Sequence, residues 1–244
     1  MIHWLIQSAN DCPELAADAV LAGWLHPAEQ AKLATLKTAK RRQDWLLGRL
    51  TAKQLIQTVM GGALPLPAIE IHNGDKGDPM VNCQWSMVNG QWSTGGAQSP
   101  ISNLQPPISL SISHSRGHAF CAVVERPFSP LGADLEWVET RLDGFAEDYF
   151  TAAECERVYR ADEGMRYVLI TAVWSAKEAA LKALHLGLTV DTRAVECLIE
   201  PVAERPLNWL PFKVRCENGR LPQPAPALTG WWRTWNNFVL TLVG

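Results

Sequence analysis

The sequence has no long apolar run, and this absence excludes the simplest kind of membrane protein. A membrane-spanning helix needs ~18 or more apolar residues in a row, and no stretch of the chain approaches that length. The first residues, MIHWLIQSANDCPEL, also lack the basic segment and the following apolar stretch of a secretory signal. We therefore expect a cytoplasmic protein without a membrane partner.

Paired cysteines are absent as well. The 6 cysteines are widely scattered and form no Cys-x-x-Cys pair, so neither a zinc knuckle nor a disulfide scaffold is indicated. The chain is 47% hydrophobic and 19% charged, which excludes a mainly disordered or fibrous protein. What remains for 244 residues is a globular protein of one large domain or two modest ones.

The sequence also lacks a strong excess of positive or negative charge. There are 22 basic and 25 acidic residues, and this net charge of -3 does not by itself indicate a polyanionic partner. The distribution is informative, because residues 31–53 carry seven basic residues and only Asp44 as an acidic one. This local excess of positive charge indicates that one small region binds an anion.

The basic segment is compatible with a phosphorylated nucleotide, with a nucleic-acid backbone, or with a solvated helix face that binds nothing. The negative overall charge and the lack of zinc-finger spacing or a recognisable RNP motif count against nucleic acid. The chain also contains neither a Walker A motif nor a Gly-x-Gly-x-x-Gly sequence after a strand. A bound nucleotide would therefore need a different phosphate cradle.

Periodicity divides the first half of the chain into a helix, an insertion and a hairpin. Helix formers at helical spacing predict a helix over residues 28–59, which Gly61 and Gly62 end. Residues 80–107 contain no charged residue and several Gly and Pro, so they resemble a long insertion. Alternation in residues 108–113, a turn at Gly117 and an apolar run over 119–124 predict a β-hairpin.

The second half begins after the linker-like residues 127–130. A short strand is expected in LGADLEWVE, a helix within residues 143–161, and the clearest helix of the chain over residues 166–185, ending near Gly187. The tail after Leu188 is strand-like and rich in Trp. Trp45 and Trp174 each precede a lysine by eight residues, which hints at a duplicated half.

Two acidic residues in the predicted strand suggest a metal site. Asp134 and Glu136 are two residues apart, so both carboxylates project from the same face of a strand. Such a pair repels itself unless a cation lies between the carboxylates, and Mg2+ is the usual ion where a phosphate completes its shell. An exposed acidic edge is the alternative, and it is favoured when this motif is considered alone.

The helix over residues 166–185 presents a polar stripe that includes Glu178 and Lys182. Glu178 is a candidate third carboxylate, and Lys182, one turn further on, is placed to neutralise a phosphate oxygen or a leaving group. The alternative is an ordinary ion pair between these two residues on a solvated face. Without other evidence this alternative is favoured.

His114 ends a predicted strand at a turn, where its imidazole and the hydroxyl of Ser113 are candidates to hydrogen-bond an anionic oxygen. A hydrolase triad is disfavoured, because the chain has no Gly-x-Ser-x-Gly motif. A partly exposed turn histidine is an equally good interpretation at this point. His72 and three other histidines have no such context.

Together, the motifs LSISHS, GADLE and FTAAE-x(19)-WSAKEAALK, preceded by RRQDWLLGRLTAK, resemble the 4'-phosphopantetheinyl transferase superfamily. The resemblance spans roughly residues 28–190 and is greatest to the long, pseudo-twofold, surfactin-synthetase-activating group. It implies an α+β fold of two similar α/β halves, residues 1–129 and 130–244, with coenzyme A in the cleft between them. That group is usually monomeric, so we expect a monomer.

The resemblance also implies an activity: transfer of the phosphopantetheine arm of coenzyme A to a serine of an apo acyl or peptidyl carrier protein, with release of adenosine 3',5'-bisphosphate. Mg2+ would be required, held by Asp134, Glu136 and Glu178. Lys182 would contact the pyrophosphate, and Glu178 or a metal-bound water would take the serine proton. His114 with Ser113 would hold a coenzyme A phosphate, and the candidates for the 3'-phosphate are Lys32, Arg41, Arg42 and Arg49.

This chain departs from the family pattern at two motifs, besides its insertion. Gly77-Asp78-Pro79 stands where the family usually has Gly-Lys-Pro, so a basic phosphate contact is lost unless Lys76 replaces it. Phe150-Thr151 replaces Phe-Ser and keeps the hydroxyl. Two other hypotheses therefore stay open, a coenzyme A or nucleotide-binding module that has lost catalysis and, ranked lower, a nucleic-acid-binding protein.

Overall fold

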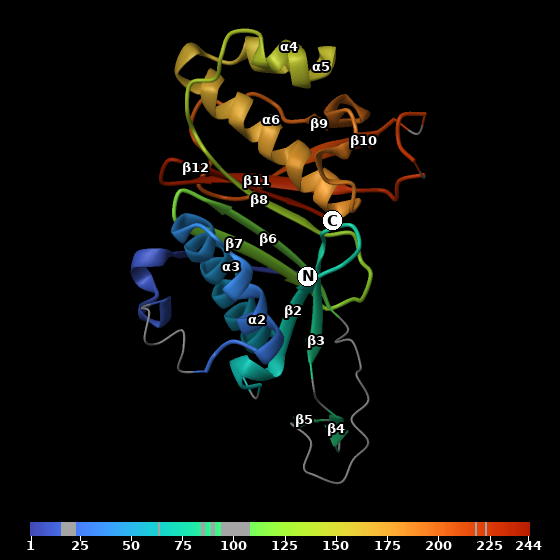
Figure 1. The fold of residues 1–244 in the computed structure, drawn as a ribbon. Helices are drawn as coiled ribbons and strands as arrows, with labels where there is room; N and C mark the ends of the chain where they lie inside the picture. The colour runs from blue at the N-terminus through green and yellow to red at the C-terminus, as the bar shows by residue number, and fades with distance from the viewer. Residues whose placement is uncertain are drawn as a thin grey trace. The chain divides into compact units, whose positions relative to one another are not determined.

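The structure is a computed structural model that describes residues 1–15, 23–62, 64–83, 86–88, 91–93, 108–217, 219–222 and 224–244. The chain forms two compact units, Met1–Ser129 and Pro130–Gly244, which we describe separately. Each unit combines antiparallel strands with helices, so the predicted α+β class is confirmed (Figure 1). No helix among the described residues has the length and apolar character needed to cross a membrane.

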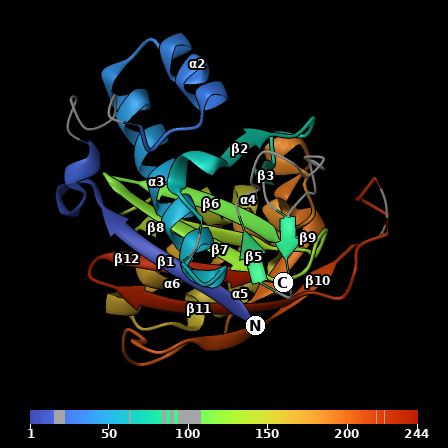
Figure 2. The ribbon, with the colours of Figure 1, turned by 90° about the horizontal axis from the view of Figure 1, so that it is seen from below.

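The N-terminal unit packs one long helix on a three-stranded antiparallel sheet, in the order β1-β7-β6 (Figure 2). A separate pair of antiparallel strands, β2 and β3, lies next to β6. The two short strands β4 (Ser86–Val88) and β5 (Gln91–Ser93) form a further pair. The remaining elements are β1 (Ile2–Ser8), α2 (Pro27–Thr35), α3 (Ala39–Val59), β2 (Ile69–Asn73), β3 (Pro79–Cys83), β6 (Ser109–Ser115) and β7 (His118–Val124).

Two predictions for this unit need correction. The single helix predicted over residues 28–59 is two helices, because Leu36 adopts an extended conformation and Thr38 starts α3 by accepting a hydrogen bond from the backbone N–H of Arg41. The insertion predicted over residues 80–107 starts later, since residues up to Cys83 belong to β3 and pair with β2. Most of its remaining residues lie outside the described part of the chain.

The predicted hairpin is confirmed as β6 and β7, which are joined by a turn with positive φ at Arg116 and Gly117. The sequence analysis missed β1, which pairs antiparallel with β7 from Ile2 to Ser8. This pairing joins segments more than 100 residues apart, so no local turn signal indicates it.

The C-terminal unit packs a 21-residue helix, α6, across a five-stranded antiparallel sheet in the order β8-β12-β11-β10-β9 (Figure 1). The predicted strand around Asp134 and the predicted strand-rich tail are both confirmed. The helix predicted within residues 143–161 is two helices, α4 and α5. The elements are β8 (Gly132–Trp137), α4 (Phe145–Tyr149), α5 (Ala152–Arg160), α6 (Glu163–Ala183), β9 (Val195–Leu198), β10 (Leu210–Cys216), β11 (Thr229–Trp235) and β12 (Phe238–Val243).

Small residues bring α6 very close to β8. A Cβ atom placed on Gly132 would lie only 1.7 Å from the backbone oxygen of Ala179. The helix ends at Ala183, earlier than predicted, because His185 takes the left-handed conformation and the N–H of Leu186 reaches back to the oxygen of Leu181. This is the Schellman type of helix end, here with histidine where glycine is usual.

The two units repeat one pattern of elements. In each, a short helix with a capping-box glutamate, Glu29 or Glu154, precedes a 21-residue helix that supplies a fully buried lysine. Glu29 lies 2.5 Å from Lys53, and Glu154 lies 2.8 Å from Lys177. Each glutamate also accepts the backbone N–H of a residue in the following strand, β2 or β9.

The repeat has a different register from the one that the tryptophan spacing hinted at. The Trp-Lys spacing would match Lys53 with Lys182. In the structure Lys53 corresponds instead to Lys177, which lies five residues before Lys182. The outer strands correspond as well, because β1-β7-β6 has the same order and antiparallel pairing as β8-β12-β11. The pseudo-twofold axis that would relate the two halves stays a prediction.

Candidate metal centre and anion cavity

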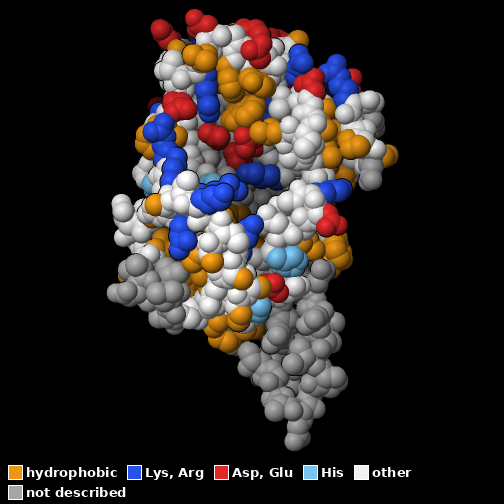
Figure 3. All heavy atoms as spheres, in the orientation of Figure 1, with side chains coloured by type: hydrophobic (Ala, Val, Ile, Leu, Met, Phe, Trp, Pro, Cys, Tyr) orange, Lys and Arg blue, Asp and Glu red, His pale blue; other side chains and the backbone are white. Residues whose placement is uncertain are grey.

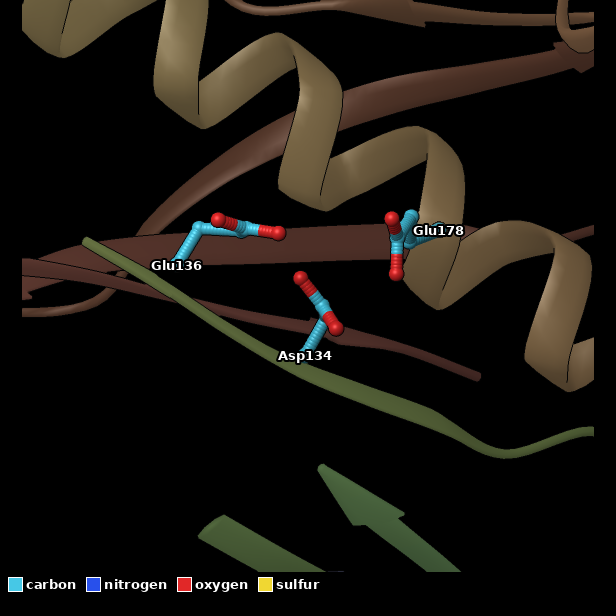
Figure 4. Close-up of side chains that lie close together, drawn as sticks. All are labelled: Asp134, Glu136 and Glu178. Carbon is cyan, nitrogen blue, oxygen red and sulfur yellow. The ribbon is translucent and has the colours of Figure 1, made fainter. Parts of the chain in front are cut away.

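Three carboxylates converge in the C-terminal unit (Figure 4). Asp134 and Glu136 project from the same face of β8, as their spacing predicts, and Glu178 projects toward them from α6. One oxygen of each carboxylate lies within 4.8 Å of the others. Two residues of a strand and one residue of the helix that packs on it are therefore enough to build the cluster.

Burial makes this cluster electrostatically unfavourable on its own. Asp134 is only 2% exposed, and both glutamates are half-buried. Burial, followed by the charge of Asp134, raises the pKa of Glu178 to about 7. Burial and Asp134 also raise the pKa of Glu136 above its usual range. A site that holds several buried carboxylates close together favours a bound cation or a proton.

Two basic side chains partly neutralise the cluster. Lys182 donates to Oδ1 of Asp134 at 2.6 Å and to the backbone oxygen of Ala133 at 3.2 Å. Lys182 therefore pairs with residues of β8. The alternative interpretation, an i,i+4 ion pair with Glu178 along the helix, is wrong. Arg141, which the sequence analysis missed, lies 3.3 Å from Oε2 of Glu136.

An aromatic cluster lies beside the carboxylates. Trp174 on α6 makes edge contacts with Phe145 and Tyr149 of α4, with ring centroids 5.4 and 5.3 Å away. Its indole also acts on Glu136, where it works against the rise in the pKa of that carboxyl. The space-filling view shows acidic side chains gathered next to hydrophobic ones on this face of the C-terminal unit (Figure 3).

The residues present fit a hard divalent cation. The donor set consists only of carboxylate oxygens, which Mg2+ and Ca2+ prefer over nitrogen or sulfur ligands. Burial first, and then the charge of Asp134, raises the pKa values of Glu136 and Glu178, although nearby Arg141 and Lys182 act in the opposite direction. The cluster thus has the chemistry of a cation site, where an ion would add positive charge among the carboxylates.

The N-terminal unit contains a cavity of about 850 Å³ between α2, α3, β2 and β6. Lys and Arg side chains gather on this part of the unit in the space-filling view (Figure 3). The basic and imidazole side chains that line the cavity are Lys32, Lys40, Arg41, Arg49, His72 and His114. Glu29, Asp44 and Glu70 line it as well, and Glu29 is already paired with Lys53. The basic side chains are therefore in slight excess, which favours a ligand with negative charge.

The cavity separates the predicted anion-binding residues into two groups. Lys32, Arg41, Arg49 and His114 line it. Arg42, Lys76 and Ser113 do not line it. The guanidinium of Arg42 instead donates to the backbone oxygen of Leu33. Ser113 is only 7% exposed, because it lies on the opposite face of its strand from its neighbour His114.

Arg49 has the most constrained position among these residues. It is 8% exposed, its guanidinium donates to Oδ1 of Asn73 at 3.2 Å, and its Nε lies 4.0 Å from Oε1 of Glu29, beyond hydrogen-bond distance. Asn73 and Glu29 thus hold the guanidinium at the wall of the cavity, where its charge can attract an anionic ligand. The sequence analysis did not name Lys40 or His72 as site residues, and His72 reaches the cavity because β2 packs against α2.

Comparisons with known proteins bear on the C-terminal unit above all. Residues 130–223 match the family model of the 4'-phosphopantetheinyl transferase superfamily. The matched range contains all three carboxylates and Lys182. The predicted resemblance to this superfamily is therefore confirmed, whereas the long pseudo-twofold group stays a prediction. No curated protein matches the sequence.

Solved structures of holo-acyl-carrier-protein synthases align with about half of the chain. The enzyme of Bacillus anthracis is 23% identical, with a TM-score of 0.36 over 50% of this chain and 91% of its own. The Helicobacter pylori enzyme is 16% identical, with a TM-score of 0.35 over 51% of this chain and 98% of its own. The Plasmodium yoelii enzyme is 21% identical, with a TM-score of 0.36 over 50% and 90%.

Proposed function

Starting from residues 130–223 as a domain of the 4'-phosphopantetheinyl transferase superfamily, we propose that this protein transfers 4'-phosphopantetheine from coenzyme A to a serine hydroxyl of an apo carrier protein. The observation that supports the proposal most is the convergence of Asp134, Glu136 and Glu178, with Lys182 bonded to the first of them. An acyl or peptidyl carrier is the proposed acceptor, and adenosine 3',5'-bisphosphate the proposed second product.

The three carboxylates would hold Mg2+. When bound, the ion supplies positive charge that offsets the charge developing on the diphosphate. The protein's own contribution is to fix the ligands, with Asp134 and Glu136 on β8, where both are paired with β12, and Glu178 on the helix packed against it. Phosphoryl transfer needs mainly positioning and neutralisation, and this arrangement provides both.

In the proposed reaction the serine oxygen forms a bond to the phosphorus that carries the pantetheine arm. The bond from that phosphorus to the bridging oxygen breaks, and this oxygen leaves as part of adenosine 3',5'-bisphosphate. The serine proton would go to the carboxylate of Glu178, which lies in the same cluster. Lys182 would neutralise charge on the diphosphate.

The cavity of the N-terminal unit would bind the nucleotide end of coenzyme A, which carries phosphate groups. Arg49 is the best-placed donor, because it lines the cavity and because Asn73 and Glu29 hold its guanidinium in place. Lys32, Arg41 and His114 would add further charge or hydrogen bonds from the walls of the cavity. The basic residue missing at Asp78 would therefore be replaced from α3.

A module that binds coenzyme A but has lost catalysis is the alternative, and the substitution by Asp78 motivates it. The intact set of three carboxylates favours transfer, since binding of a nucleotide alone does not require them. A cytoplasmic, monomeric protein stays a prediction.

Intact-mass measurement on purified apo carrier proteins tests the proposal directly. With this protein, coenzyme A and Mg2+, a suitable carrier should gain the mass of one phosphopantetheine group. The gain should disappear when the acceptor serine of the carrier is replaced by alanine or when Glu178→Gln is used. If coenzyme A binds in calorimetry while several acyl and peptidyl carriers stay unmodified, the non-catalytic alternative replaces the transferase.

A further inference from the structure

We propose that Ser175 and Thr241 form a buried hydroxyl relay that positions Asp134 for the divalent cation. The hydroxyl of Ser175 lies 2.8 Å from Oδ2 of Asp134 and 2.8 Å from the hydroxyl of Thr241. The inference rests on the proposed metal-dependent function. It assigns Ser175 and Thr241 as positioning residues, which act through Asp134 and touch neither substrate nor ion.

The direction of the relay follows from counting protons. An ionised carboxylate only accepts hydrogen bonds, so Ser175 must donate its single hydroxyl proton to Asp134. The hydroxyl of Thr241 must then donate to Ser175. Donors arranged in one direction polarise each other, which strengthens the bond that reaches the carboxylate.

The relay joins three elements of the C-terminal unit at one point. Asp134 lies on β8, Thr241 is its cross-strand partner on β12, and Ser175 lies on α6. Asp134 is 2% exposed and both hydroxyl residues are fully buried, so water does not replace these bonds. Oδ2 is therefore fixed by the relay, while Oδ1 is turned toward Lys182. The rotation of the carboxylate is determined at both oxygens.

The N-terminal unit shows that the fold itself does not need this relay. Aligned on the hairpin turns β6–β7 and β11–β12, the pair Asp134–Thr241 corresponds to the pair Leu5–Cys121 in the other unit, which also faces the long helix. Counted from the buried lysines, Ser175 corresponds to Thr51. The hydroxyl of Thr51 is buried and has no hydrogen-bond partner.

The same arrangement of helix and strands therefore occurs in both units. The linked hydroxyls of Ser175 and Thr241 occur in the C-terminal unit, which is the one that carries the three carboxylates. A purely structural hydroxyl pair would be expected in either unit. Its restriction to the copy that carries Asp134 indicates that it serves the carboxylate. Residues behind metal ligands fix ligand orientation in this way, and they affect metal affinity without touching the ion.

Direct titration of the full-length protein with Mn2+ or Mg2+, without coenzyme A or carrier, tests the relay. Ser175→Ala should raise the Kd by about 10-fold, in the range typical of outer-shell partners. Thr241→Val keeps the shape but not the hydroxyl, so a rise of about 3-fold is expected, whereas Thr241→Ser keeps the hydroxyl and should stay near wild type. If Thr241 acts through Ser175, the double variant should bind no more weakly than Ser175→Ala alone.

Thr51→Val is the matched control, since it removes a buried hydroxyl at the corresponding place in the other unit and should leave the Kd unchanged. Circular dichroism of each metal-free variant shows that the fold is retained. Unchanged Kd values for both Ser175→Ala and Thr241→Val in a wild type that binds the ion would overturn the relay alone. A wild type that binds no divalent ion would overturn the metal-dependent function together with it.

Discussion

The ammonium group of Lys182 lies 2.6 Å from Oδ1 of Asp134, across from its own helix to the neighbouring strand. The lysine is 31% exposed at its side chain, whereas the aspartate is 2% exposed. Lys182 thus extends from the buried carboxylate toward solvent, where a diphosphate can reach it. This geometry, and not an ion pair along the helix, makes Lys182 a candidate for stabilising the negative charge that develops on a diphosphate during transfer.

Lys182→Ala should lower kcat more than it changes the KM for coenzyme A. Loss of a charge that acts mainly in the transition state typically costs about 10²- to 10³-fold in kcat. Steady-state kinetics with one apo carrier gives both constants. The exposed Lys213 provides the control, because Lys213→Ala removes the same charge far from the carboxylates along β10. A change confined to KM would contradict the transition-state role.

Glu178→Gln should change the pH dependence of stability. The folded-state pKa of Glu178 is raised to about 7, so its stabilising contribution is present below the unfolded pKa of ~4.5 and is lost as pH rises through 7. The variant should therefore be more stable than metal-free wild type at pH 8, by on the order of 2 kcal/mol, and similar at low pH. Urea unfolding at pH 5 and 8 measures this difference.

Added Mg2+ should abolish that advantage, because the ion stabilises only the wild-type cluster. Glu163→Gln at the start of the same helix is the control, since it removes a carboxylate outside the cluster. An advantage of Glu178→Gln that is the same at pH 5 and pH 8 would mean that the ionised carboxylate is not the cause.

Gly132→Ala should separate α6 from β8. The added methyl group would lie 1.7 Å from the backbone oxygen of Ala179, and neither backbone can move aside cheaply. We expect a loss of at least about 3 kcal/mol in unfolding free energy, together with weaker Mn2+ binding. Gly164→Ala is matched to it, because no atom lies within 4 Å of its new Cβ. That control should gain about 0.5 kcal/mol.

Glu29→Gln and Glu154→Gln should each destabilise their unit strongly. Each substitution leaves a fully buried lysine, Lys53 or Lys177, without its counter-charge. Breaking a buried ion pair in this way typically costs about 3–5 kcal/mol, measured by chemical denaturation. Asp191→Asn removes an exposed partner of Arg193 and should have little effect. Equal, small effects for all three variants would contradict the structural role of the buried pairs.

Arg49→Gln should weaken binding of adenosine 3',5'-bisphosphate, measured by calorimetry without metal or carrier. Its charged hydrogen bonds to a phosphate would be lost, so we expect a rise of about 10-fold in Kd. Arg42→Gln removes the same charge from the same helix, but Arg42 donates to the oxygen of Leu33 and does not line the cavity. If both variants weaken binding equally, general surface charge and not the cavity attracts the nucleotide.

Local patterns were sufficient to predict the parts of the protein that depend on neighbouring residues. The spacing of Asp134 and Glu136 determines their common face, and the alternation around Gly117 predicts the hairpin β6–β7. The position of Glu178 on a long helix also follows from periodicity. The match of residues 130–223 to the superfamily confirms the resemblance for the motifs in that range, which contain Asp134, Glu136 and Glu178.

Features that depend on contacts distant in sequence could not be predicted in this way. The partner of Lys182 is Asp134, 48 residues away, and Thr241 reaches Ser175 from 66 residues away. The break between α2 and α3 depends on the cap made by Thr38, which hydrophobic periodicity does not report. The orientation of Arg42 away from the cavity is likewise a result of packing.

The buried Glu–Lys pair, Glu29–Lys53 in one unit and Glu154–Lys177 in the other, belongs to the architecture that both units share. Both halves keep this pair, yet among the described residues only the second half carries the three-carboxylate cluster, since Leu5 stands where that half has Asp134. Substitutions that reshape the cavity of the first unit thus leave every residue of the proposed cation site unchanged, because all three carboxylates belong to the second.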